Sequence, residues 1–294
     1  MYTNFDLGIE GRKITGYHWA IENPKKVVVL IHGIGEHAGR YSRMAGYFAK
    51  AGIALVSMDL RGHGRSDGVR GHTAPRVEVL SDIDKLIEYA QEAYPGLPLI
   101  LYGHSMGGNL VLDYRRRGKL SGVPDGYIIS APWVKLANDF PKPVVGIIRF
   151  LSRICPQMRV SSSCDEGLLG NPDSVRPYND DPMVHGSITL LCAAECYTIG
   201  EQLFEGALHG RDAAGVPDAG TKKPTLLMHG SADRICSVEG SRQIAAMEPD
   251  ITYVEWEGYF HEIHNGNKTE TGEAAILRAI DFISNLGTGT KLEK

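Results

Sequence analysis

The chain has 294 residues, 43% of them hydrophobic and 22% charged, which is enough for one large α/β domain or two smaller domains. Its formal net charge of −4 provides no basic surface, so no nucleic acid is expected as a partner. No apolar run reaches the roughly 18 residues that cross a membrane.

The first ten residues, MYTNFDLGIE, lack the basic and apolar regions of a secretory signal. We therefore expect a cytoplasmic protein, with peripheral membrane association as an alternative. Five cysteines without metal-type spacing suggest reduced, mostly structural thiols. Cys192 and Cys196 would share one helix face, where packing is favoured over a redox or metal pair. No metal or organic cofactor is expected, and both a monomer and a homodimer are compatible with the sequence.

Short β-branched apolar runs alternate with amphipathic segments of helical length. A polar hairpin near residue 12 precedes the first buried strand. Strands are expected at 27–31, 53–58, 97–102, 126–130, 225–230 and 251–256. Helices are expected near 40–51, 78–93, 106–117, 237–247 and 272–285. Strands that are apolar along their whole length are typical of a mostly parallel sheet covered by helices on both faces.

The alternation stops between residues 132 and 223, a segment too long for a loop. We expect an inserted, mainly helical cap there, with the core formed by 1–131 and 224–294. Residues 143–154 place apolar side chains at helical spacing. This helix could simply pack on the core, or it could line an acyl tunnel and touch lipid with its apolar face. The polar tail after residue 286 is expected to be frayed.

Two serines carry the G-x-S-x-G pattern of a hydrolase nucleophile, Ser66 in GRSDG and Ser105 in GHSMG. A nucleophile elbow requires a strand, a tight turn bounded by glycines and then a helix. Ser105 follows the buried run LPLILY and precedes the amphipathic segment MGGNLVLDYRRR. Ser66 follows a polar loop, and no helical pattern begins after it. The sequence therefore predicts Ser105 as the nucleophile and a structural role for Ser66.

A serine nucleophile requires a base and an acid that orients the base. In α/β hydrolases the acid follows a late strand. Asp233 lies directly after TLLMHGSA and fits this order. Three other aspartates lie in the insertion or before a strand, which is a poorer match: Asp212, Asp218 and Asp250.

The base is expected in the loop after the last strand, WEGYFHEIHNG, which contains His261 and His264. His261 is nearer to the strand and is favoured. The oxyanion hole needs two backbone N–H groups beside the nucleophile. Met106 follows the nucleophile, and Ile34 lies between two glycines in the loop after the first buried strand, so these two are the expected donors.

Six segments together resemble the monoacylglycerol lipase and lysophospholipase-like branch of the α/β hydrolases. They are HGIGEHAGRY, DLRGHGRSDG, YGHSMGG, NDDPMVHGSIT, GSADRIC and WEGYFHEIH. The resemblance implies an α/β-hydrolase fold with a cap, and a serine carboxylester hydrolase. By motif match it implies the catalytic triad Ser105, Asp233 and His261, with Ile34 and Met106 as oxyanion donors.

The same resemblance implies that Glu36, Arg40 and His264 surround the glycerol head of the substrate. Alternatively, Glu36 and Arg40 form an ion pair that only anchors their loop. Cys236 matches a position where mammalian members carry a thiol, and we expect no role for it in the chemistry.

The expected reaction is hydrolysis of a monoacylglycerol to a fatty acid and glycerol. The alternative keeps the same residues but acts on lysophospholipids, or on short-chain or aromatic esters. The expected partner is a small lipid ester, with transient membrane or micelle contact through the helix at 143–154. A hydrolase-fold binding protein is disfavoured because all three triad residues are present in the right order.

Overall fold

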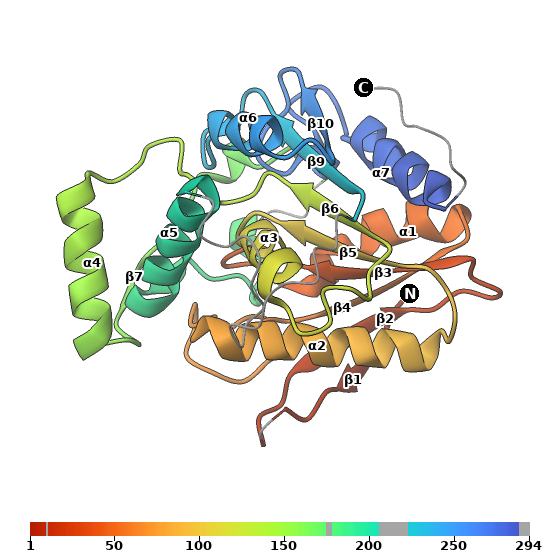
Figure 1. Cartoon of the computed structure of the whole chain (residues 1–294), viewed down its shortest axis with the longest axis horizontal. Coiled ribbons are helices and arrows are strands. Elements are labelled where there is room, and N and C mark those ends of the chain that lie inside the picture. The colour runs from red at the N-terminus through yellow and green to blue at the C-terminus, as the bar shows by residue number, and fades with distance from the viewer. Residues whose placement is uncertain (10, 175–177, 206–222, 288–294) are drawn as a thin grey trace.

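A mixed sheet lies at the centre of the computed structural model, which describes residues 1–9, 11–174, 178–205 and 223–287 (Figure 1). The strands of this sheet are β1 (Thr3–Asp6), β2 (Thr15–Trp19), β3 (Lys26–Ile31), β4 (Ile53–Met58), β5 (Leu99–His104), β6 (Gly126–Ser130), β9 (Thr225–Gly230) and β10 (Ile251–Trp256). Their order across the sheet is β1-β2-β4-β3-β5-β6-β9-β10. β2 runs antiparallel to β1 and β4, and the neighbours from β4 to β10 are parallel. The predicted mostly parallel sheet is confirmed.

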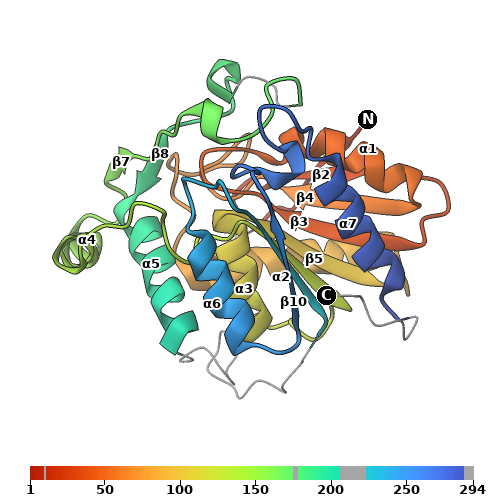
Figure 2. The ribbon, with the colours of Figure 1, turned by 90° about the horizontal axis from the view of Figure 1, so that it is seen from above.

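Two layers of helices cover the sheet. They are α1 (Ser42–Lys50), α2 (Arg76–Ala93), α3 (Met106–Arg117), α6 (Val238–Met247) and α7 (Glu273–Asn285). Side chains of α1 and α7 share one hydrophobic core with alternate residues of the strands, for example Val28 and Leu30. The other face of the strands packs against α2, α3 and α6. Figure 2 shows α1 and α7 on one side of the sheet and α3 and α6 on the other. Because both faces are covered, the central strands are apolar throughout.

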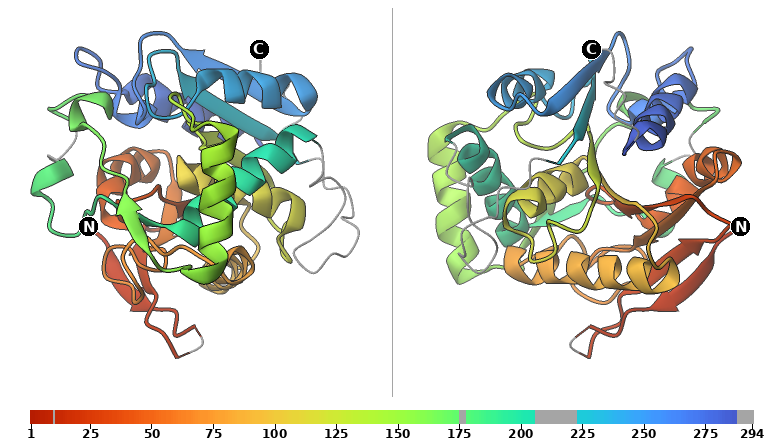
Figure 3. Two further views of the ribbon diagram at one scale, coloured as in Figure 1. Left: turned by 90° about the vertical axis from the view of Figure 1, so that its left-hand side faces the viewer. Right: turned by 45° about the vertical axis from the view of Figure 1, so that its right-hand side comes forward.

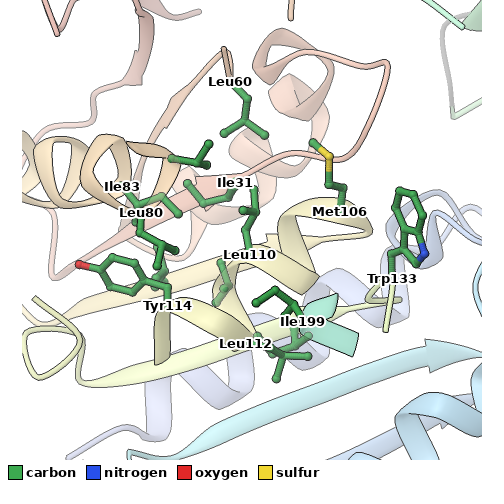
Figure 4. Packing of buried hydrophobic residues seen from close by; sticks show 14 of the residues in the cluster. Ile31, Leu60, Leu80, Ile83, Met106, Leu110, Leu112, Tyr114, Trp133 and Ile199 are labelled. Atoms are coloured by element: carbon green, nitrogen blue, oxygen red, sulfur yellow. The ribbon is translucent and has the colours of Figure 1, made fainter. Parts of the chain in front are cut away.

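The core beneath α3 shows how closely the layers meet. Leu110 and Met106 of α3 lie over Ile31 of β3, and Leu80 and Ile83 of α2 complete this cluster (Figure 4). All five side chains are buried, with at most 1% of their surface exposed. A rigid core of this kind fixes the strand ends that carry the loops of the site.

The ends of the parallel strands lie level with one another. Ile31 pairs with Gly103, and His104 pairs with Ser130. The loops after β3, β5, β9 and β10 therefore leave the sheet along the same edge. In open α/β sheets this carboxyl edge is where ligands bind.

An insertion separates β6 from β9. It contains α4 (Lys142–Ile154), β7 (Arg159–Ser161), β8 (Ser187–Thr189) and α5 (Leu190–Glu205). α4 packs on α5 and is the outer of the two described α-helices of the insertion (Figures 1 and 3). The antiparallel pair β7–β8 was not predicted. Part of the expected cap, 175–177 and 206–222, and the tail 288–294 lie outside the described residues.

Element boundaries differ slightly from the sequence prediction. β5 spans 99–104 instead of 97–102, because Pro98 has no N–H for the ladder while pairing with β6 continues to His104. A 3₁₀ turn, Ala38–Tyr41, replaces the first residues of the helix expected at 40–51. The hairpin near residue 12 is formed by β1 and β2.

Candidate active site

The predicted nucleophile lies at a strained turn between β5 and α3. Ser105 has φ 56° and ψ −119°, which side chains rarely adopt outside special turns. A methyl group on Gly107 would overlap the carbonyl oxygen of Ile31, and one on Gly103 would overlap that of Gly107. The two glycines therefore allow α3 to start directly behind the strand. The turn presents Ser105 at the edge of the sheet, with 5% of its surface exposed.

The three predicted triad residues lie within hydrogen-bond distance of one another. Ser105 Oγ is 2.9 Å from His261 Nε2, and His261 Nδ1 is 2.7 Å from Asp233 Oδ2. This is the geometry needed for a serine whose proton passes to an oriented imidazole. Of the two candidate histidines, only His261 makes these two contacts within the described chain.

Asp233 is held by four N–H donors. Its Oδ1 accepts from the backbone of Ile235 at 2.7 Å and of Cys236 at 3.0 Å, and its Oδ2 accepts from His261 and from His229 at 3.0 Å. Burial alone would raise the pKa of this carboxyl, but His261 and His229 hold it well below its usual range. Asp233 therefore stays ionised. Its charge in turn raises the pKa of His261, although burial of the ring opposes this.

The competing aspartate Asp250 has a different partner. Asp250 pairs with Arg115 at the far end of α3. Asp212 and Asp218 lie outside the described residues. His229 was missed by sequence reasoning, although the TLLMHGSAD segment places it four residues before Asp233.

The loop after β3 lies against the nucleophile. A methyl group on Gly33 would lie 3.0 Å from Ser105 Cβ, so only glycine fits comfortably here. The N–H groups of Ile34 and Met106 donate to no other described residue, which leaves both available for an oxyanion. His32 anchors the loop: its Nδ1–H donates to Gly33 O at 2.7 Å, and its Nε2 accepts from Leu60 N at 2.9 Å.

The insertion also contacts this loop. His185 N donates to Gly35 O at 2.9 Å, and the Tyr178 hydroxyl lies 3.4 Å from Ile34 O. A buried contact of 3.1 Å joins His37 Nε2 to Asp181 Oδ2. This part of the insertion is therefore tied to the loop that supplies Ile34.

A small polar cavity of about 50 Å³ lies beside Ser105. It is lined by Glu36 and Arg40, for which the sequence offers a head-group role or a structural ion pair, and also by Glu262, which was not predicted. Arg40 bridges the two carboxyl groups, at 2.8 Å from Glu36 Oε2 and 2.7 Å from Glu262 Oε1. Burial raises the pKa of Glu36, whereas Arg40 and His264 hold the pKa of Glu262 well below its usual range against the effect of burial.

Glu36 also has a second set of partners. Its Oε1 accepts from Gly33 N at 2.7 Å and from the Tyr41 hydroxyl at 2.9 Å. The carboxyl group thus braces the loop, which agrees with the alternative of an anchoring ion pair, while the residue also lines the polar cavity.

His264 is placed differently from Glu36 and Arg40. Its ring stacks on Tyr41 with centroids 5.2 Å apart, and it is not among the residues that line the polar cavity. Burial lowers the pKa of His264 to about 4, so the ring is neutral at ordinary pH. His104, which sequence reasoning missed, lines the cavity, with its ring 4.9 Å from that of His261.

A much larger apolar cavity, about 580 Å³, also reaches Ser105. Its apolar lining comes mostly from the insertion and includes Trp133, Leu136, Ile148, Leu190, Tyr197 and Ile235. The helix expected at 143–154 is observed as α4, and Ile148 of that helix faces this cavity. Other apolar residues of α4 face outward, with exposed fractions of 58% for Ile147 and 61% for Phe150.

The cysteines are free thiols. Cys192 and Cys196 are both buried in α5, where Cys192 Sγ lies 3.7 Å from Met106 Sδ and Cys196 Sγ lies 3.6 Å from Arg76 Nη2. Burial raises the pKa of Cys236 well above its usual range, which keeps this thiol protonated. Among the described residues, no group of three or more His, Cys, Asp or Glu side chains could hold a metal ion.

Comparisons with known proteins identify a family and several relatives that are similar to this chain. The family model described as "Serine aminopeptidase, S33" matches residues 22–268. A monoacylglycerol lipase of Mycolicibacterium smegmatis is 34% identical over 263 residues, which cover 88% of this chain and 89% of that protein. The crystal structure of Paleococcus ferrophilus monoacylglycerol lipase matches with a TM-score of 0.77 at 30% identity, over 94% of this chain and 99% of that one. A soluble variant of monoglyceride lipase from Saccharomyces cerevisiae, in complex with a substrate analog, matches with a TM-score of 0.81 at 24% identity. The match covers 100% of this chain and 95% of that one, which shows a common fold.

Proposed function

Because the chain belongs to the serine aminopeptidase, S33, family and within it to the monoacylglycerol lipase-like α/β hydrolases, we propose that it hydrolyses monoacylglycerols to a fatty acid and glycerol. One observation carries this proposal beyond the family. A large apolar cavity and a small polar cavity meet at Ser105. An ester bound there has its acyl chain in the first cavity and its alcohol in the second.

The first half of the reaction forms an acyl-enzyme. His261 Nε2 takes the proton of the Ser105 hydroxyl, and Ser105 Oγ attacks the ester carbonyl carbon. The N–H groups of Ile34 and Met106 stabilise the resulting oxyanion, each contributing about 3 kcal/mol in comparable sites. The bond to the glycerol oxygen then breaks, and protonated His261 donates its proton to the departing alcohol.

The second half releases the acid. Water enters the space that glycerol leaves, and His261 removes a proton from it. The hydroxide attacks the acyl carbonyl, the same N–H groups hold the oxyanion, and the bond to Ser105 Oγ breaks. The proton returns to Ser105, and the fatty acid leaves through the apolar cavity. Asp233 holds the His261 tautomer throughout and stabilises the imidazolium.

The polar cavity favours glycerol over a phospholipid head group. One guanidinium, Arg40, faces two carboxyl groups, Glu36 and Glu262, so the cavity offers no uncompensated positive charge to a phosphate. A space of about 50 Å³ holds only a few water molecules or a polar group of similar size. We therefore favour monoacylglycerols over lysophospholipids, the alternative substrates.

A comparison of substrates tests this function. The proposal expects higher kcat/KM on 1- and 2-monoacylglycerols than on lysophosphatidylcholine and p-nitrophenyl esters of the same acyl chain. Labelling with a fluorophosphonate and its loss in Ser105→Ala would identify the nucleophile. Equal or higher rates on the non-glycerol esters would reject glycerol recognition, and full activity of Ser105→Ala would reject the mechanism.

We further propose that the cap, residues 132–223, contacts the membrane or micelle that supplies the substrate. The outward face of α4 carries Val144, Ile147, Phe150 and Ile154, each at least 38% exposed. Arg153 lies on the same helix, and Lys142 begins it. Apolar residues flanked by basic ones are typical of helices that lie at an anionic interface. Within the described chain, no helix combines the length and apolar character needed to cross a bilayer.

A further inference from the structure

Three consecutive serines, 161–163, lie at the end of β7, whose last residue is Ser161. Ser162 N donates to Gly186 O at 3.1 Å, which extends the pairing of β7 with β8 by one step. The two strands lie side by side (Figure 2). Alternate side chains of an extended segment point to opposite sides. Ser162 and Cys164 line the polar cavity beside Ser105, whereas Ser161 and Ser163 line only the large apolar cavity.

The hydroxyl of Ser162 differs from those of its neighbours. Ser161 Oγ and Ser163 Oγ lie 3.1 Å apart and form a hydrogen bond with each other. Ser162 Oγ is buried and has no hydrogen-bond partner among the described residues. Buried hydroxyls in native proteins are nearly always paired, so one left unpaired beside a cavity indicates a partner inside the cavity, either water or a polar group of a ligand that displaces it.

The nearest cavity-lining neighbour of Ser162 in the chain is the thiol of Cys164. Burial, with the nearby Glu262 carboxylate, raises the pKa of Cys164 to about 11, so this thiol stays neutral. Ser162 therefore adds one neutral donor and acceptor to a cavity in which Glu36, Arg40 and Glu262 already bind one another.

Ser162 also lines the apolar cavity, so it lies where the two cavities meet. The ester group of a bound substrate lies at the same junction, because both cavities meet at Ser105. We propose that the Ser162 hydroxyl hydrogen-bonds a free hydroxyl of the glycerol moiety and is a specificity-determining residue supplied by the cap. This inference rests on the proposed hydrolysis of monoacylglycerols.

The contact is tested by combining one enzyme substitution with the removal of single hydroxyl groups from the substrate. The wild type and Ser162→Ala are assayed on 1-decanoylglycerol and on the monodecanoates of 1,2-propanediol and 1,3-propanediol, which each lack one glycerol hydroxyl. We expect Ser162→Ala to lower kcat/KM on the glycerol ester by about tenfold, the usual size of one lost neutral hydrogen bond. On the diol ester that lacks the bound hydroxyl, kcat/KM should change by less than about twofold, because that contact is already absent.

Two further measurements separate binding from folding. Ser187→Ala, in the adjacent strand β8 and outside the lining of both cavities, should leave all three rates unchanged. Ser162→Ala should not lower the melting temperature, because removal of an unpaired buried hydroxyl takes no hydrogen bond from the folded state.

An equal loss on all three esters, no loss on any, or a clear drop in melting temperature would overturn the role of Ser162. If the wild type prefers glycerol esters and Ser162→Ala keeps that preference, only the role of Ser162 fails. If the wild type hydrolyses p-nitrophenyl decanoate but not 1-decanoylglycerol, the proposed function fails as well.

Discussion

His229 Nε2 lies 3.0 Å from Asp233 Oδ2, the same carboxylate oxygen that His261 Nδ1 approaches to 2.7 Å. A carboxylate oxygen only accepts hydrogen bonds, so both imidazoles present an N–H to it. Ser241 Oγ, 2.7 Å from His229 Nδ1, donates to that nitrogen and thereby fixes the His229 tautomer. The carboxylate that orients the catalytic base thus accepts hydrogen bonds from two imidazole rings.

Removal of the second donor should change the pH profile. In His229→Leu the Asp233 carboxylate loses the hydrogen bond from His229 and therefore interacts more strongly with the His261 imidazolium. The pKa of His261, already raised, rises further. The base acts only when neutral, so the acidic limb of kcat/KM should move to higher pH, by roughly one unit or less. Measured profiles should therefore show a larger loss at pH 6 than at pH 8.

His229→Gln serves as the matched control for this change, because its amide N–H can still reach Asp233. The limb of this variant should stay near that of the wild type. A loss in His229→Leu that is the same at every pH would mean that His229 contributes only to folding.

The serine of GRSDG gives a second prediction. Ser66 Oγ donates to Asp59 O at 2.6 Å and accepts from Thr15 N at 2.9 Å, which joins its loop to β2. Ser66→Ala removes both buried hydrogen bonds and should lower the free energy of unfolding by about 1–3 kcal/mol. The kcat on a soluble ester should stay unchanged, since the described hydrogen bonds of the Ser66 side chain go to Thr15 and Asp59 and not to the triad. Urea denaturation and an ester assay measure the two quantities; a large fall in kcat with normal stability would contradict the assignment.

The features predicted from the sequence depend on local patterns. Continuous apolar runs mark the buried strands, and a strand, a glycine-bounded turn and a helix distinguish Ser105 from Ser66 without tertiary information. Glu262 and His229 have no such pattern. Glu262 meets Arg40 across 222 positions of chain, and the significance of His229 depends on how β9 brings it to Asp233. His264 was assigned to the glycerol site by family resemblance, and the packing of its ring on Tyr41 could not be derived from that resemblance.

The insertion likewise contains a helix that the sequence predicts and a strand pair that it does not. Helical periodicity indicates α4 from its own thirteen residues. The three-residue strands β7 and β8 carry too short a pattern to be recognised, and they pair across the intervening loop. The placement of Ser162 follows from that pairing, so it was not accessible before the fold was known.

Two glycines in helices should respond to alanine in opposite ways. At Gly107 a methyl group would overlap the carbonyl oxygens of Ile31 and His32, so Gly107→Ala should push α3 from β3 and abolish hydrolysis. At Gly46, in α1, a methyl group meets no atom within 4 Å, and the residue is exposed. Gly46→Ala should therefore raise the free energy of unfolding by about 0.5–1 kcal/mol and leave kcat unchanged. Thermal unfolding with parallel assays measures both; a fully active Gly107→Ala would contradict the tight elbow.

The outward face of α4 gives the last prediction. The double variant Ile147→Glu/Phe150→Glu places two carboxylates on that face and should abolish co-sedimentation with vesicles of phosphatidylglycerol and phosphatidylcholine. Neither side chain lines the apolar cavity, so hydrolysis of dissolved p-nitrophenyl butyrate should be unchanged. Hydrolysis of monoacylglycerol in vesicles should fall, because the enzyme no longer reaches its substrate.

Leu277→Glu is the control for this surface. Leu277 is 49% exposed, and it lies on α7, a helix that covers the central sheet and is not part of the cap. It introduces the same type of charge at an exposed apolar position, and its vesicle binding should equal that of the wild type. Equal binding by all three proteins, or no binding by the wild type, would exclude α4 as the membrane contact. If Leu277→Glu also lost binding, the effect would come from net charge rather than from the cap, because electrostatic attraction to anionic lipid depends on the whole protein.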